Sequence, residues 1–121
     1  MTRTALIVDD SSSVRQMVAY TLRQAGFAVL EGCNGADALE KLGEQRVNLI
    51  ITDLNMPVMD GIEFIRSVRS KPNGKYTPVL MLTTENQMEK KQQGRSAGAT
   101  GWIVKPFHPD RLLEIVAKVV P

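Results

Sequence analysis

The 121-residue chain has one cysteine, one tryptophan, two tyrosines, three phenylalanines and a net charge of only +2. The single cysteine, Cys33, excludes an intramolecular disulfide, and without neighbouring metal ligands we interpret it as a packing residue. No segment approaches the ~20 apolar residues of a transmembrane helix, and the chain lacks the pattern of a signal peptide. The few aromatic residues and the small net charge argue against a stripe of basic and aromatic side chains that could bind nucleic acid. We expect a cytoplasmic protein that binds neither membrane nor nucleic acid.

The remaining composition is that of one ordinary globular domain. Hydrophobic residues make up 43% and charged residues 23% of the chain, values that are typical of globular proteins. A chain of this length buries roughly two-thirds of its unfolded surface, which supports one core. We therefore expect a single, monomeric domain over residues 1–121.

Five apolar, β-rich runs alternate with five helix-like segments. This order is typical of an α/β fold, a doubly wound parallel sheet with helices on both faces. The expected strands are Ala5–Val8, Ala28–Leu30, Leu49–Ile51, Val79–Leu82 and Trp102–Val104. The expected helices follow the serines at 11–13, cover Gly35–Leu42, Gly61–Val68 and Gln87–Ala97, and begin at His108.

The helices differ in how well their apolar residues can anchor them. In the second helix, Ala36, Leu39 and Leu42 form a stripe that we expect to face inward. The fourth helix offers only Met88 and Ala97 as apolar anchors, and Gly94 lies inside it. Two interpretations remain open for it: it is the least firmly held element, or packing of small residues suffices.

Three acidic residues follow apolar runs that the pattern places in one parallel sheet. Asp9 and Asp10 end the first run, and Asp53 follows the third. Because the carboxyl ends of neighbouring parallel strands meet in one crevice, the three carboxylates are expected to lie together. Lys105, after the fifth strand, contributes one positive charge and leaves two negatives. Mg²⁺, which binds through carboxylates and keeps several waters, matches that deficit.

The first acidic pair is also compatible with two roles that need no metal. A phosphate-cradling nucleotide loop would place glycines after the first strand, but residues 9–13 read Asp-Asp-Ser-Ser-Ser. Helix capping alone could account for Asp9 and Asp10. A third acid, Asp53, at the same end of the sheet favours the metal site.

The order of these motifs resembles the receiver domains of bacterial two-component response regulators, most of all the single-domain chemotaxis type. The residues that carry the resemblance are Asp9-Asp10, Asp53-Leu54-Asn55-Met56-Pro57 with Asp60-Gly61, Thr83, and Lys105-Pro106-Phe107. They span essentially the whole chain. The resemblance implies a flavodoxin-like sheet with strand order 2-1-3-4-5 and five helices.

The resemblance also implies roles for individual residues. Asp53 is the expected phosphoacceptor, receiving a phosphoryl group from the phosphohistidine of a histidine kinase. Mg²⁺ is expected on Asp10, Asp53 and the backbone carbonyl of Asn55, with Asp9 acting through water. Lys105 and the Thr83 hydroxyl are expected to hold phosphoryl oxygens.

Three further features follow from the same resemblance. The Lys105-Pro106 bond is expected to be cis, an isomer that costs ~0.5–1 kcal/mol before proline. Asn55 and Glu85 hold the positions that tune dephosphorylation. Trp102 holds the position of an aromatic switch residue that turns inward with Thr83, although tyrosine is the usual residue there.

The expected function is a phosphorylation-activated signalling switch, which catalyses only its own phosphoryl transfer and autodephosphorylation. Output is expected through protein contact on the surface formed by the fourth helix, fifth strand and fifth helix; for a chemotaxis role the implied partner is a flagellar motor switch protein. The alternatives are a receiver-like interaction module outside chemotaxis and an aspartyl-phosphate phosphatase. The phosphatase alternative lacks its general acid, because Asn55 stands where a second aspartate would be needed.

Overall fold

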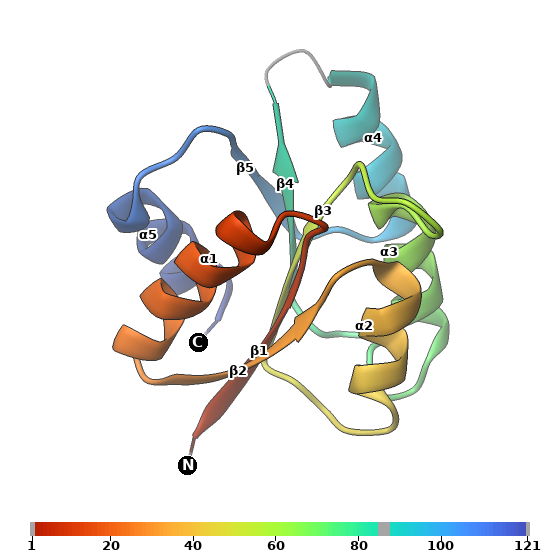
Figure 1. The fold of residues 1–121 in the computed structure, drawn as a ribbon. Coiled ribbons are helices and arrows are strands. Elements are labelled where there is room, and N and C mark those ends of the chain that lie inside the picture. The colour runs from red at the N-terminus through yellow and green to blue at the C-terminus, as the bar shows by residue number, and fades with distance from the viewer. Residues whose placement is uncertain (1, 85–87, 121) are drawn as a thin grey trace.

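The computed structural model describes residues 2–84 and 88–120, in which strands and helices alternate along the chain (Figure 1). The elements are β1 (Arg3–Val8), α1 (Ser12–Gln24), β2 (Phe27–Gly32), α2 (Gly35–Leu42), β3 (Leu49–Asp53), α3 (Gly61–Ser70), β4 (Val79–Thr83), α4 (Met88–Ala97), β5 (Gly101–Val104) and α5 (Pro109–Val119). The predicted strands and helices are confirmed within a few residues at each end, and the predicted bounds of α2 coincide with the observed ones. Gln87, the predicted first residue of the fourth helix, lies outside the described residues.

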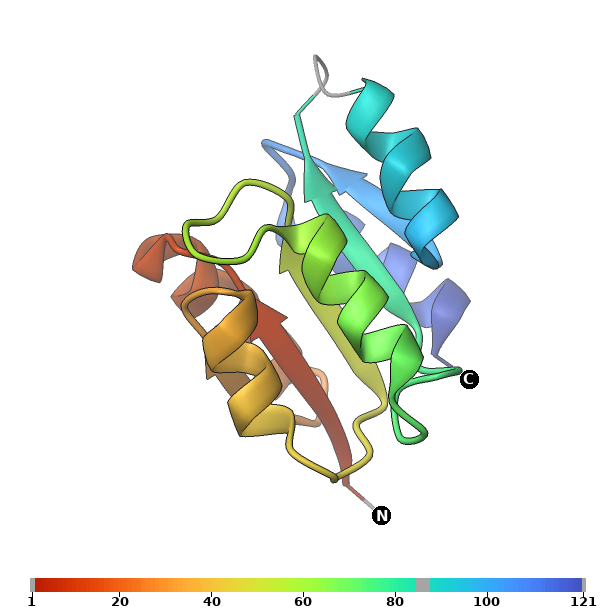
Figure 2. The ribbon, with the colours of Figure 1, turned by 90° about the vertical axis from the view of Figure 1, so that its right-hand side faces the viewer.

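The five strands form one parallel sheet in the order β2-β1-β3-β4-β5. This is the expected doubly wound, flavodoxin-like topology. Helices α1 and α5 cover one face, and α2, α3 and α4 cover the other (Figures 1 and 2). Strand β2 lies on one side of β1, and the chain then crosses to the other side of β1 to form β3. The carboxyl end of β1 is therefore at a topological switch point, where α/β sheets bind ligands.

Each face of the sheet has its own apolar core. Leu6, Ile50, Phe64 and Met81 lie in the core under α2 and α3, and Ile7, Ile51, Leu80 and Leu112 lie in the core under α1 and α5. Alternate residues of one strand enter opposite cores, so β1, β3 and β4 are apolar over most of their length. A sheet buried on both faces is a firm base for side chains at its ends.

Helix termini are set by local hydrogen bonds and by local backbone conformation. The Ser11 side chain accepts a hydrogen bond from the Val14 amide and caps α1, and Asp60 caps α3 through the Glu63 amide. Beyond α1, Gly26 has φ +97°, a left-handed backbone that favours glycine. The caps at Ser11 and Asp60 determine where the two loops at the carboxyl edge, after β1 and after β3, end.

Two predictions about burial are wrong. Ala36 is not part of the buried core, and Ala38 takes its place there. Gly32 explains the change: a Cβ there would lie 2.8 Å from the Ala38 Cβ, so the strand and helix meet at Ala38. Cys33 is exposed, because it lies in the loop beyond β2 and not in a core.

Helix α4 is held by close contact and by hydrogen bonds. Gly94 is buried, and a methyl group there would collide with the sulfur of Met81. Beyond the helix, the Arg69 guanidinium donates two hydrogen bonds to the Gly98 carbonyl, at 2.9 and 2.7 Å. Close packing at a small residue therefore contributes to holding α4. No helix in the described part of the chain is long and apolar enough to cross a membrane.

Candidate functional site

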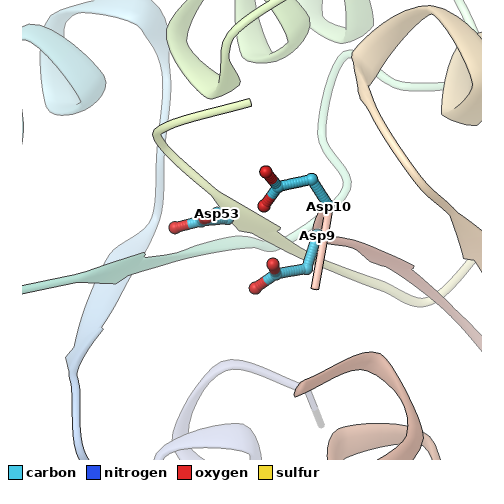
Figure 3. A group of neighbouring side chains, drawn as sticks. All are labelled: Asp9, Asp10 and Asp53. Carbon is cyan, nitrogen blue, oxygen red and sulfur yellow. The ribbon is translucent and has the colours of Figure 1, made fainter. Parts of the chain in front are cut away.

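The carboxylates of Asp9, Asp10 and Asp53 come together at the carboxyl edge of the sheet (Figure 3). One oxygen from each lies within 4.8 Å of the others. Val8 of β1 pairs in register with Thr52 of β3, so both strands end at the same level. The sequence prediction of one acidic crevice is confirmed.

The three aspartates differ in their surroundings. Asp9 is 1% exposed and Asp53 8%, whereas Asp10 is exposed. Burial raises the pKa of Asp9 above its ordinary value, an effect that the Ser11 amide opposes and the neighbouring Asp53 charge reinforces. A buried carboxylate beside a second one is costly unless a cation joins them.

Lys105 places a positively charged ammonium group beside two of the aspartates. Its Nζ lies 3.2 Å from Asp53 Oδ1 and 3.4 Å from Asp9 Oδ2. The Lys105 amide donates a hydrogen bond of 2.6 Å to the Thr83 carbonyl, which fixes the residue beside the end of β4. The Lys105-Pro106 peptide bond is cis, as predicted.

Asp53 ends β3 in a tightly packed turn. Its Oδ1 accepts a hydrogen bond of 2.9 Å from the Leu54 amide, and the Gly61 amide donates to the Leu54 carbonyl. A Cβ on Gly61 would collide with the Asp53 carbonyl oxygen. Glycine is therefore required where α3 begins against the backbone of Asp53.

Thr83 has a buried hydroxyl with no hydrogen-bond partner among the described residues. The side chain is 0% exposed and lies at the end of β4. Leaving such a group unpaired costs roughly 1–3 kcal/mol. An acceptor brought to the neighbouring crevice, such as a phosphoryl oxygen, would satisfy it.

The loop after β3 carries Asn55, which is exposed at the crevice side of the sheet. Met56 is buried, and the Met59 amide donates to the Pro57 carbonyl across Val58, whose φ is +72°. A β-branched residue with this backbone is rare and strained. Glu85, the other predicted tuning residue, lies outside the described residues.

Trp102 lies away from the acidic crevice, on β5 beside α4. It is partly buried, and Lys91 and Arg95 lie over its ring at 5.4 and 5.1 Å from the centroid. Its register partner on β4 is the fully buried Met81. Trp102 is therefore held at the surface by two cations, with a core methionine beside it.

Sequence reasoning missed one residue of the crevice, Arg15. Its Nη1 donates a hydrogen bond of 2.6 Å to the backbone carbonyl of Asp9. A signal was available, since a helical side chain reaches toward the N-terminus of its helix, and α1 begins just after the acidic pair. Arg15 was missed because a charged residue on a helix is usually a solvent-exposed one.

The donor set fits a hard divalent cation. All three clustered groups are carboxylates, the oxygen ligands that Mg²⁺ prefers. With Lys105 included, the cluster keeps two uncompensated negative charges when every carboxylate is ionised, which matches the charge of such an ion. A phosphate alone does not fit, because the same carboxylates would repel it.

Comparison with known proteins agrees with this geometry. Residues 5–117 match the family model of the response regulator receiver domain. Chemotaxis protein CheY1 of Helicobacter pylori is 40% identical over 111 residues, covering 90% of each chain. The structure of chemotaxis response regulator CheY4 of Vibrio cholerae is 50% identical, with a TM-score of 0.93 over 99% of this chain and 100% of that one. A receiver domain of a Pseudomonas aeruginosa sensor histidine kinase, solved with magnesium coordinated in its active site cleft, is 26% identical with a TM-score of 0.89, covering 98% of each chain. The chain belongs to the response regulator receiver domain family.

Proposed function

We propose that this protein is a phosphorylation-activated switch of a two-component phosphorelay, with Asp53 as the phosphoacceptor. The observation that carries the proposal is the meeting of Asp53 with two further carboxylates and a lysine ammonium. The buried Thr83 hydroxyl at the end of β4, which has no hydrogen-bond partner within residues 2–84 and 88–120, adds to it. Those groups are the ones that a phosphoryl transfer to aspartate needs. Membership in the receiver family supports the same function.

The chain's own residues supply alignment and charge. Asp53 Oδ attacks the phosphorus atom of a phosphohistidine, the phosphorus–nitrogen bond breaks, and an acyl phosphate forms on Asp53. Lys105, now 3.2 Å from Asp53 Oδ1, would move to a phosphoryl oxygen and neutralise part of its charge. The Thr83 hydroxyl would donate to another. Phosphoryl transfer depends mainly on such positioning and electrostatic stabilisation.

Mg²⁺ is the proposed cofactor, held by Asp10, Asp53 and the Asn55 carbonyl, with Asp9 acting through water. When bound, it supplies positive charge to the phosphoryl oxygens and offsets the repulsion between carboxylates. The Pseudomonas receiver domain, which has magnesium coordinated in its active site cleft, supports this assignment.

Signalling would end by hydrolysis, because an acyl phosphate is a reactive mixed anhydride. Asn55 and Glu85 are proposed to tune access of the attacking water. The protein would catalyse only its own phosphoryl transfer and dephosphorylation and would not be a multiple-turnover enzyme. We also propose that it acts in the cytoplasm and as a monomer.

Output is proposed through the surface formed by α4, β5 and α5. Thr83, drawn toward the phosphoryl group, and Trp102 are the proposed switch pair. Lys91 and Arg95 place basic side chains on this surface, so an acidic partner segment would be complementary to them. The chemotaxis names of the similar proteins favour a flagellar motor switch protein.

The test is intact mass spectrometry after incubation with a small acyl phosphate. With Mg²⁺, the native chain should gain one phosphoryl group, and with EDTA it should gain none. Asp53→Asn should gain none in either buffer, whereas Asp60→Asn, which removes an acid from the same loop outside the cluster, should behave as the native chain. Equal labelling of native protein and Asp53→Asn would contradict the proposal.

A further inference from the structure

Arg15 contacts the acidic crevice without touching any of its carboxylates. Its Nη1 donates to the Asp9 backbone carbonyl at 2.6 Å, and its Nε lies 3.5 Å from Glu31 Oε1 of β2. The side chain is 19% exposed. One guanidinium thus joins the loop after β1 to the neighbouring strand.

The hydrogen bond fixes the peptide unit between the two adjacent aspartates. The carbonyl of Asp9 and the amide of Asp10 belong to one planar group, so a donor on this oxygen sets the direction in which Asp10 leaves the loop. The Asp9 carboxylate has partners of its own, in the Ser11 amide at 2.9 Å and Lys105. The Asp10 carboxylate makes no hydrogen bond or ion pair within residues 2–84 and 88–120. Its orientation therefore depends on the backbone that Arg15 holds.

The position of Arg15 opposes ordinary helix electrostatics. It lies one turn into α1, near the positive end of the helix dipole, and the first turn contains no acid. A cation there is unfavourable for the helix alone. Partial burial of the charge adds to that cost, and the two acceptors, the Asp9 carbonyl and the Glu31 carboxylate, offset it. The side chain is therefore placed by these two contacts and not by a preference of the helix.

We infer that Arg15 is a positioning residue for the cation site, acting through the Asp9–Asp10 peptide, with Glu31 holding the guanidinium in place. The inference rests on the proposed function, in which Mg²⁺ binds Asp10. It predicts a direction of change in Mg²⁺ affinity that the charge of Arg15 alone would not produce. Arg15 is a positive charge beside a cation site, so charge alone predicts that its removal would tighten Mg²⁺ binding, whereas loss of positioning weakens it.

The experiment is a calorimetric Mg²⁺ titration of the full chain and three variants at fixed ionic strength. Arg15→Met should weaken Mg²⁺ binding roughly tenfold, the lower end of the loss seen when groups that orient metal ligands are removed. Arg23→Met is the matched control, because Arg23 lies on the same helix and pairs with the same Glu31 at 3.8 Å without a bond to the Asp9 carbonyl. It should bind Mg²⁺ as the native chain does.

Arg15→Lys keeps the charge in a single ammonium that cannot serve both acceptors, and its affinity should fall between those of native protein and Arg15→Met. It also keeps the test valid should Arg15→Met fail to fold. Unchanged or tighter binding in the Arg15 variants, measured while far-ultraviolet circular dichroism shows them folded, overturns the inference. Absence of Mg²⁺ binding by the native chain would instead overturn the proposed metal site on which it rests.

Discussion

Trp102 is the chain's single tryptophan, so its fluorescence reports on one place, the proposed output surface between α4 and β5. Two cations lie over the ring, Lys91 at 5.4 Å and Arg95 at 5.1 Å. Each such contact is worth about 0.5–1 kcal/mol at an exposed site. Together they favour the surface position by about 1–2 kcal/mol, a population ratio of about 5–30.

Any inward turn of the ring on phosphorylation must overcome this preference. It must also find space beside Met81, which is fully buried and contacts α4 at Gly94. We therefore expect native Trp102 to respond weakly. Removing both cations with Lys91→Ala and Arg95→Ala should lower the cost of inward movement and enlarge the response.

The assay is the emission maximum of Trp102 and its quenching by acrylamide, before and after phosphorylation with Mg²⁺ and a small acyl phosphate. The native chain should show little change, and the Lys91→Ala/Arg95→Ala variant should shift to shorter wavelength and become less accessible to quencher. Lys90→Ala is the control, since Lys90 is not among the described cations over the ring. A full blue shift in the native chain, or identical responses in native and double-variant proteins, would refute the reasoning.

Two predictions concern stability. Burial raises the pKa of Asp9 in the folded state above its ordinary 3.8. Between pH 3.8 and that raised pKa the folded state binds more protons than the unfolded state, so the free energy of unfolding falls as pH rises through this window. Asp9→Asn should therefore be more stable than the native chain at pH 7 in EDTA, by urea unfolding, and should lose that advantage below pH 3.8; lower stability at pH 7 would contradict the assigned cause. For Gly94→Ala, the collision with buried Met81 costs about 1–3 kcal/mol, more than the ~1 kcal/mol that alanine contributes to a helix. Net destabilisation should appear in the same assay and be relieved by adding Met81→Ala, and a more stable Gly94→Ala would show that Met81 moves aside freely.

Features set by periodicity and by chain order could be predicted from the sequence. The apolar runs locate the strands, because strands buried on both faces have few alternatives. Once the runs are parallel neighbours, Asp9, Asp10 and Asp53 must meet at one edge. The strand order itself came from resemblance, since alternation of strands and helices does not determine which strands pair.

Features set by contact between distant elements could not be predicted. Ala36 and Ala38 are equally apolar, and only the approach of Gly32 decides which is buried. Two features depend on side chains from separate elements: the Thr83 hydroxyl, which has no partner in the described part of the chain, and the cations over Trp102. Their directions are fixed by tertiary packing, which local sequence pattern does not carry.

Chemical identification of the phosphorylated residue tests the central proposal most directly. Hydride from sodium borohydride reduces an acyl phosphate to an alcohol, so an aspartyl phosphate becomes homoserine, with loss of phosphate. After phosphorylation with Mg²⁺, reduction and proteolysis, peptide mass spectrometry should find homoserine at position 53 and an unchanged aspartate at positions 9 and 10. Homoserine at another position, or at none while the intact chain carries a phosphoryl group, would contradict the assignment of Asp53 as the phosphoacceptor.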